Sequence, residues 1–324
     1  MLGIVVVSRS KNSTDSRTKD NNSFNLAFVG INFKISMPKD IEEVFFKDYL
    51  NYLPPFKVTN EGPKINIYIY RDKPSLVVES ENIILSNESS DKQLSKDTIL
   101  LVSKFLEQKL NETDTFSLHA SAVLSGNRGI AIVGPNGSGK TTSAIYSCFV
   151  DKNIEFVSGN RLFINKVNIV SSTHGIRLRA GSLESEFKLG SYILPDTSAF
   201  QDRKVSLVAE NLGIKVNVDY PIKLTKIVLV KKLEKGLSVK RLDMSDETQS
   251  NEAFLIIYNS ASEFSDNFPN VVLGSKIPYP NMFTNEHRQK RIDFVSNLLR
   301  NVELVKVEGR LEEIGWYISQ NIKK

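Results

Sequence analysis

The chain has 324 residues, of which 40% are hydrophobic, so it holds enough apolar material for one large domain or two smaller ones. Lysine and arginine outnumber aspartate and glutamate by 42 to 37, which gives a formal net charge of +5 at pH 7. This excess of positive charge favours anionic ligands. A nucleic-acid partner is compatible with it but is not indicated by it. The single cysteine, Cys148, excludes an intrachain disulfide, a thiolate zinc site and an iron–sulfur cluster.

The first 24 residues predict a flexible segment that carries no targeting signal. Residues 1–7 are apolar, but they lack a basic start and are too short to span a membrane, and a polar tract follows them. With the single cysteine, this predicts a cytoplasmic protein with no membrane partner.

Residues 25–112 predict a small α+β domain. The expected elements are paired strands, a short helix, a strand of period two, a hairpin and a long helix. They lie at 25–35, 41–50, 65–70, 77–78 with 83–85, and 96–110. No residue in this domain carries recognisable chemistry, so we expect it to serve as a lid, an acceptor-docking surface or a contact in a homo-oligomer.

The most informative motif follows a strand-like apolar run at residues 129–133. Residues 134–141 read Gly-Pro-Asn-Gly-Ser-Gly-Lys-Thr, the complete G-x-x-x-x-G-K-[ST] pattern of a phosphate-binding loop (P-loop, Walker A). Such a loop needs a buried strand before it and a helix after it, and residues 142–146 predict that helix. Its glycines let successive backbone N–H groups converge on phosphate oxygens.

The loop predicts binding of ATP with Mg²⁺. Lys140 would reach the β- and γ-phosphates, and the Thr141 hydroxyl would complete a metal shell otherwise made of water and phosphate. The residues expected to bind the nucleotide are Gly134, Pro135, Asn136, Gly137, Ser138, Gly139, Lys140, Thr141 and Thr142. An ABC-type or motor ATPase is not favoured, because the Leu-Ser-Gly-Gly-Gln signature of the former is absent.

Antiparallel strand pairs are expected on both sides of this loop, whereas common P-loop proteins repeat parallel βαβ units. These hairpins, the run Leu118-His-Ala-Ser-Ala-Val123, the loop itself and a C-terminal strand at 302–309 resemble the catalytic domain of the HPr kinase/phosphorylase family. That family shares its nucleotide-binding fold with phosphoenolpyruvate carboxykinases. The resemblance covers residues 116 to 324, weakly after 200. It implies an α/β kinase domain over 113–324, behind the smaller α+β domain, that passes the γ-phosphoryl group to a hydroxyl.

One departure from the family concerns its Asp-Asp pair, in which one carboxylate helps hold Mg²⁺ and the other acts as base. Gly159 and Asn160 stand at those positions. Asn160 can still offer an oxygen to the metal, whereas Gly159 is expected to leave a space. Three explanations stay open. In the first, positioning of the reacting groups is enough for phosphoryl transfer without a base. In the second, another group takes the proton, and in the third the chain binds nucleotide without transferring phosphate. The groups considered for the proton are His119, Glu184, Glu186, Asp196 and Asp202.

The sequence therefore predicts a phosphotransferase acting on an alcohol group. Its predicted catalytic residues are Lys140, His119 and Asn160, with Thr141 and Asn160 on the metal. The acceptor stays open among a peptide or protein serine, a sugar, a nucleoside and an RNA hydroxyl. The alternative is a catalytically inactive nucleotide-binding regulator or scaffold.

Four further features are expected to be structural. We expect a basic cluster at residues 226–241 to be a solvated face, and Arg161 to lie on an exposed strand edge rather than to clamp phosphate. His174 is expected in a surface turn. Trp316, in a helix predicted at 311–322, is expected in the core because of its spacing from Ile314 and Ile318.

Overall fold

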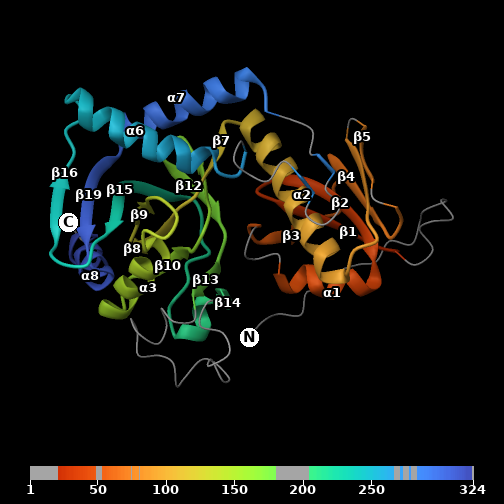
Figure 1. The fold of residues 1–324 in the computed structure, drawn as a ribbon, viewed down its shortest axis with the longest axis horizontal. Coiled ribbons are helices and arrows are strands. Elements are labelled where there is room, and N and C mark those ends of the chain that lie inside the picture. The colour runs from red at the N-terminus through yellow and green to blue at the C-terminus, as the bar shows by residue number, and fades with distance from the viewer. Residues whose placement is uncertain are drawn as a thin grey trace. The chain divides into compact units, whose positions relative to one another are not determined.

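The computed structural model describes residues 21–48, 53–73, 75–79, 81–179, 204–265, 271–272, 277–278 and 283–322. The chain divides into two compact units, made of Met1–Leu110 with Asn267–Met282 and of Asn111–Asp266 with Phe283–Lys324. Both units mix helices and strands, so the α/β class is confirmed (Figure 1). The segment Asn267–Met282, which the sequence assigns to the C-terminal domain, clusters with the first unit.

The first unit holds a six-stranded mixed sheet. Its elements in chain order are β1 (Asn21–Phe28), β2 (Ile31–Pro38), α1 (Lys39–Asp48), β3 (Phe56–Val58), β4 (Ile65–Tyr70), β5 (Ser75–Glu79), β6 (Asn82–Ser86) and α2 (Asp91–Glu112). The strand order is β3-β1-β2-β4-β6-β5, with β2, β4 and β6 parallel. Because β1 begins at Asn21 and pairs with β2 along its length, the predicted flexible segment 1–24 extends too far; residues 1–20 lie outside the described chain.

A buried carboxylate lies on α2. Asp97 is 1% exposed, and it accepts hydrogen bonds from Gln93 Nε2 at 2.8 Å and from Asn87 Nδ2 at 3.1 Å. Burial raises its pKa to about 6, because the loss of water disfavours the ionised form more than the two hydrogen bonds favour it.

Asp97 gives the first unit a pH-dependent stability. Its folded-state pKa lies above the value of about 3.9 for an unfolded aspartate, so its contribution to folding is fully present below about pH 4 and is lost as the pH rises to about 6. We expect Asp97→Asn to flatten the pH dependence of the free energy of unfolding across that window. Urea titrations measure it, with the exposed Asp72→Asn as control. An unchanged pH slope in the Asp97 variant would contradict this account.

The second unit holds a nine-stranded mixed sheet. Its strands are β7 (Thr115–Leu118), β8 (Ser121–Ser125), β9 (Arg128–Val133), β10 (Glu155–Ser158), β11 (Leu162–Asn165), β12 (Asn168–Ser172), β15 (Ile222–Lys232), β16 (Ser238–Arg241) and β19 (Glu303–Gly309). The order is β10-β8-β9-β15-β12-β11-β7, and β19 with its neighbour β16 also joins β15. Two small hairpins pair β13 (Gly175–Arg179) with β14 (Lys204–Val208), and β17 (Val271–Val272) with β18 (Ile277–Pro278); the latter hairpin belongs to the first unit.

The expected antiparallel pairs occur, but the centre of this sheet is parallel. β8 and β9 form one antiparallel hairpin, and β11 and β12 form another. β9 pairs with β15 in parallel, and β15 pairs with β19 in parallel. The run Leu118-His-Ala-Ser-Ala-Val123 is not one continuous strand. It breaks at His119 and Ala120, because β7 pairs with β11 whereas β8 pairs with β9 and β10.

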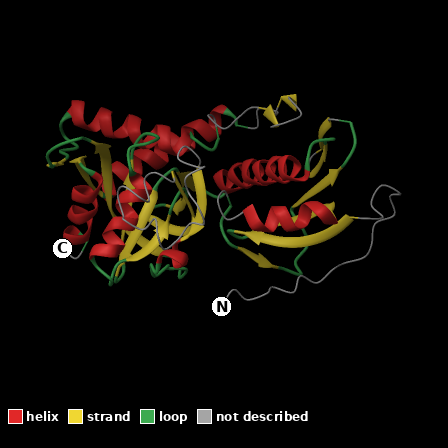
Figure 2. Ribbon diagram, turned by 60° about the horizontal axis from the view of Figure 1, so that its bottom comes forward, coloured by secondary structure: helices red, strands yellow, loops and turns green. Residues whose placement is uncertain are grey.

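Helices cover both faces of the second sheet (Figure 2). α3 (Lys140–Val150) and α8 (Leu311–Asn321) pack on one face, with Ile130, Ile132 and Val228 beneath them. α6 (Glu247–Ser262) and α7 (Asn285–Asn301) pack on the other, over Ala131, Val133 and Leu229. A 3-10 turn, η4 (Ala209–Leu212), adds to the α3 side. Successive residues of β9 therefore face opposite helix layers, as expected for a strand that is buried on both faces.

The prediction for Trp316 is wrong. Ile314 and Ile318 are buried as expected, whereas Trp316 is 52% exposed. Residues two apart on a helix lie about 200° apart around its axis, so a helix that buries Ile314 turns Trp316 outward.

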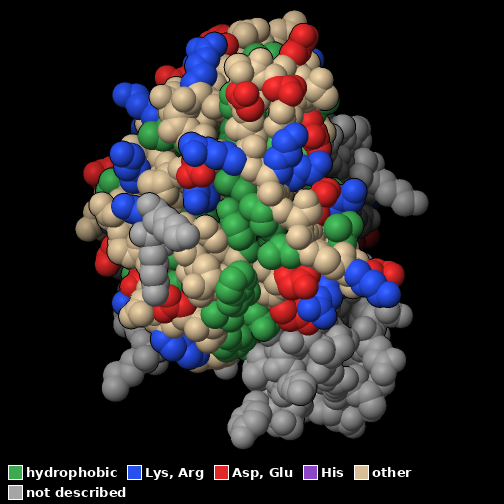
Figure 3. Space-filling view, turned by 90° about the vertical axis from the view of Figure 1, so that its left-hand side faces the viewer, with side chains coloured by type: hydrophobic (Ala, Val, Ile, Leu, Met, Phe, Trp, Pro, Cys, Tyr) green, Lys and Arg blue, Asp and Glu red, His purple; other side chains and the backbone are tan. Residues whose placement is uncertain are grey.

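The basic cluster at 226–241 lies on a surface of mixed charge. Lys226 and Arg241 both pair with Glu303, at 3.5 Å and 3.7 Å, and Lys231 pairs with Glu308 at 3.7 Å. The face at the β16 edge shows basic and acidic side chains around a band of hydrophobic ones (Figure 3). The cluster is therefore not a patch of one sign. No helix in the described ranges is both long and apolar enough to cross a bilayer.

Candidate functional site

The glycine-rich loop, residues 134–139, joins the end of β9 to the start of α3. Gly137 and Gly139 have φ values of 82° and 90°, which glycine adopts without strain. A Cβ on Gly134 would come within 2.6 Å of the Val230 carbonyl oxygen, and one on Gly139 would run into the Leu311 side chain. The loop is thus pressed against β15 and α8, and its glycines are required by packing as well as by backbone conformation.

Lys140 curls back over the start of the loop. Its Nζ donates hydrogen bonds to the carbonyl oxygens of Gly134, at 2.9 Å, and Pro135, at 3.2 Å, and the residue is 7% exposed. The ammonium group is therefore held against the first two residues of the loop.

The Thr141 hydroxyl belongs to a cluster of three oxygens. It donates to the Gly159 carbonyl at 2.8 Å, and Ser121 Oγ lies 3.1 Å from both atoms. Because its proton is directed to Gly159, the lone pairs of Thr141 are left for a cation. Neutral oxygens beside bound phosphate fit Mg²⁺, which keeps several waters and takes few protein ligands. Within the described ranges, no group of three His, Cys, Asp or Glu residues could hold a metal.

The expected space at Gly159 does not exist. A Cβ there would lie 2.5 Å from the Gly175 carbonyl oxygen and 3.4 Å from Ile176 Cα. Strand β13 begins at Gly175, and its backbone fills the space beside Gly159. Asn160 follows half-buried, and its N–H donates to Ser158 Oγ at 3.3 Å. It is the Gly159 carbonyl that contacts Thr141.

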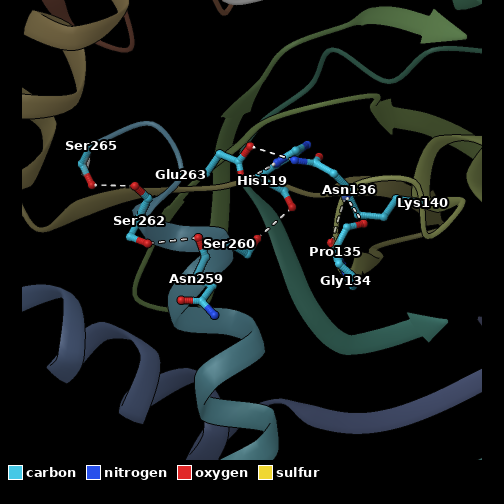
Figure 4. Close-up of polar contacts among 10 residues, drawn as sticks. All are labelled: His119, Gly134, Pro135, Asn136, Lys140, Asn259, Ser260, Ser262, Glu263 and Ser265. Atoms are coloured by element: carbon cyan, nitrogen blue, oxygen red, sulfur yellow. Dashed lines mark hydrogen bonds and ion pairs between the residues drawn. The ribbon is translucent and has the colours of Figure 1, made fainter. Parts of the chain in front are cut away.

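A different carboxylate reaches the loop from α6. Glu263, in the turn that ends this helix, places Oε2 3.2 Å from His119 Nδ1, and Asn136 Nδ2 donates to its Oε1 at 3.4 Å (Figure 4). These contacts, the one with His119 foremost, hold the pKa of Glu263 below its usual range. Glu263 is therefore an anion at neutral pH.

The backbone holds His119 in place beside α6. Its N–H donates to the Ser260 carbonyl at 3.0 Å, and Ser260 Oγ donates to the His119 carbonyl at 2.8 Å (Figure 4). These two bonds occur at the break between β7 and β8, where the backbone has left the sheet ladder. Because of this break, His119 lies between two strands and belongs to the candidate site.

Arg161 packs against the turn that carries Glu263, and it does not lie on an exposed strand edge. It is fully buried, and its guanidinium carbon lies 4.2 Å from the ring centroid of Phe264 and 4.8 Å from that of Phe163. The Phe264 ring lies 5.7 Å from the His119 ring. Arg161 therefore braces the turn that carries Glu263 through cation–π contacts, and the expectation of an exposed edge is wrong.

A buried network fixes the chain next to Gly159. His174, expected in a surface turn, is only 8% exposed, and its Nε2 lies 3.1 Å from the Tyr220 hydroxyl. That hydroxyl lies 2.7 Å from Ser172 Oγ, and burial raises the pKa of Tyr220 to about 12. This network anchors the residues that lead into β13, whose first carbonyl closes the space at Gly159.

The structure brings together most of the predicted site. The loop, Lys140 and Thr141 follow the end of β9, His119 lies just before β8 and beside Asn136's partner Glu263, and Gly159 contacts Thr141. Glu263 was not predicted; it lies 127 positions beyond Asn136, and no motif marks it. Four carboxylates considered for the proton lie outside the described residues: Glu184, Glu186, Asp196 and Asp202.

Comparison with known proteins adds no assignment. No family model matches the sequence, and no curated protein matches it.

The crowding at Gly159 can be tested by adding a side-chain carbon at this position. We expect Gly159→Ala to lower the free energy of unfolding by about 1–3 kcal/mol, because the added carbon meets backbone that cannot rotate away. Gly62→Ala is the matched control, since no atom lies within 4 Å of its Cβ. Denaturant unfolding compares the two. Equal stability of both variants would show that there is room at Gly159 after all.

Proposed function

We propose that the second unit is an HPr-kinase-like P-loop kinase, which binds ATP with Mg²⁺ and passes the γ-phosphoryl group to a hydroxyl. The observation that carries this proposal is the strand–loop–helix arrangement at residues 128–150, with Lys140 Nζ held over the first carbonyls of the loop. A motif match alone would be weaker support, because the same residues outside this context bind no phosphate.

The loop supplies the electrostatic part of the reaction. The N-terminus of α3 would direct backbone N–H groups and the positive end of the helix dipole toward a bound phosphate. Lys140 adds a full positive charge. Mg²⁺, when bound with the nucleotide, neutralises charge that develops on the phosphate oxygens. Thr141 is the residue that would hold it, and Gly159 orients the Thr141 hydroxyl.

The rival function is a regulator that binds nucleotide without chemistry. The observation in its favour is the backbone of β13, which excludes a carboxylate at position 159. The kinase is favoured because a histidine and a carboxylate in contact lie beside the loop and offer another place for the acceptor proton. We also propose a cytoplasmic location and, for the first unit, a role in acceptor docking, lid closure or oligomer contact.

Removal of the Lys140 charge tests nucleotide binding. We expect Lys140→Ala to weaken ATP affinity roughly ten- to hundredfold, the range for a lost hydrogen bond to a charged group, and to leave the fold intact. Lys235→Ala, on the exposed surface, is the matched control. Isothermal titration calorimetry with Mg²⁺ and ATP measures both. The same affinity in the Lys140 variant and in the wild type would rule out the proposed loop.

A further inference from the structure

We propose that a cavity beside the loop is the phosphoryl-acceptor site, that it takes a small polyhydroxylated molecule, and that His119, held by Glu263, removes the proton from the reacting hydroxyl. The proposal rests on the proposed function, since an acceptor site requires a nucleoside triphosphate on the loop. It names the substrate class and the group that stands in for the missing carboxylates.

The position of the cavity is the first argument. It has a volume of about 310 Å³ and is bounded at one end by residues 134–136, His119 and Glu263. Lys140 Nζ lies on the carbonyls of the same loop residues, and this lysine reaches the γ-phosphate in such loops. In such loops the backbone N–H groups at the start of the helix cradle the α- and β-phosphates, so the proposal places the nucleoside of a bound nucleotide on the side away from the cavity. The γ-phosphate therefore faces the cavity.

The lining of the cavity is the second argument. Leu229 and Ile256 provide apolar surface, whereas Glu252, Asn259 and Lys306 provide hydrogen-bonding groups. Lys306 Nζ lies 2.8 Å from Glu252 Oε1, so the charged pair is neutral overall and offers both donors and acceptors. Sugars and related polyols combine apolar C–H faces with several hydroxyls, and they match this mixture. A peptide serine brings one hydroxyl and would leave most of these groups unmatched.

The size of the cavity also favours a small acceptor molecule. A volume of about 310 Å³ lies at the small end of ligand pockets. It suits a molecule of monosaccharide or nucleoside size. α6 supplies Glu252, Ile256 and Asn259, and Glu263 follows directly at its C-cap, so one helix and its final turn position both the binding groups and the carboxylate beside His119.

The proton has a defined route. Glu263 accepts the Nδ1 proton of His119, which leaves Nε2 as the basic ring nitrogen. The acceptor oxygen forms a bond to the γ-phosphorus while the bond from that phosphorus to the β,γ-bridging oxygen breaks. The nucleoside diphosphate leaves, the hydroxyl proton passes to His119 Nε2, and water takes it after product release. The negative charge of Glu263 stabilises the imidazolium, so Glu263 is a positioning residue and His119 the catalytic one.

The first experiment tests the acceptor class. ADP release is measured with Mg²⁺ and ATP in the presence of glycerol, myo-inositol, glucose, ribose or uridine, and with a serine peptide or water alone. We expect at least one polyol to raise turnover above the water rate. Stimulation by the peptide alone, or by none of these compounds, overturns the proposed acceptor class. Calorimetric binding of ATP is read separately, so failure of the proposed function is recognised by absent nucleotide binding.

The second experiment fills the cavity. Ile256→Trp should abolish polyol-stimulated turnover or raise the polyol KM about tenfold or more while ATP affinity stays within about twofold of wild type. Leu255→Trp, on the same helix at a residue that is 58% exposed, is the matched control and should behave as wild type. Should the Ile256 variant not fold, Asn259→Tyr fills the exposed rim of the cavity. Wild-type kinetics in the folded cavity variant overturn the placement of the acceptor.

The third experiment separates His119 from Glu263. His119→Gly should lower kcat about a hundredfold or more with ATP affinity kept, and added imidazole should restore part of the loss. Glu263→Gln should lower kcat about tenfold or more with little change in the polyol KM. In the double variant, imidazole should restore much less, because the carboxylate that orients it is gone. Equal rescue with and without Glu263 would show that this carboxylate has no part in the proton transfer.

Discussion

The second unit depends on the close approach of the glycine-rich loop to its neighbours. The parallel pairing of β9 with β15 brings the end of one strand beside the other, so that Gly134 lies against the Val230 carbonyl. On the opposite side Leu311 of α8 fills the space next to Gly139, and Gly315 packs against Tyr146 of α3. The loop is thus held between a strand and a helix, which fixes the direction of its N–H groups before any ligand binds.

This tight packing also explains why the acidic group of the site comes from α6. The backbone of β13 closes the position after β10 where an aspartate would stand, and the buried bonds of His174 and Tyr220 fix the approach to that strand. The other side of the loop is bounded by α6, and the turn at its C-terminal end reaches His119 and Asn136. One side of the site therefore presents neutral oxygens, which the proposed function assigns to Mg²⁺, and the other presents the carboxylate beside His119, which it assigns to the proton transfer.

The sequence predicted the local parts of this arrangement. The loop, its preceding strand and the β8–β9 hairpin follow from patterns within about 30 residues, since turn chemistry and strand period act at short range. Glu263 could not be found this way, because only the packing of α6 on the sheet brings it to Asn136. Gly159 was misread, since a glycine marks both open space and crowding, and only the neighbouring strand distinguishes them. Trp316 was misplaced because its spacing was misread: a residue two positions from both Ile314 and Ile318 lies on the opposite face of the helix, where it is exposed.

The charge of Glu263 bears on the choice between kinase and regulator. A nucleoside triphosphate brings several negative charges to the loop, and a carboxylate whose side chain is only 34% exposed, next to Asn136 of that loop, repels them. For a protein that only binds nucleotide, this repulsion weakens affinity and brings no benefit. In a kinase the same charge stabilises His119 as it gains the proton of the acceptor hydroxyl. The placement of an anion beside a phosphate-binding loop is therefore costly in the ground state and useful in the transition state, which is the balance expected of a catalytic site.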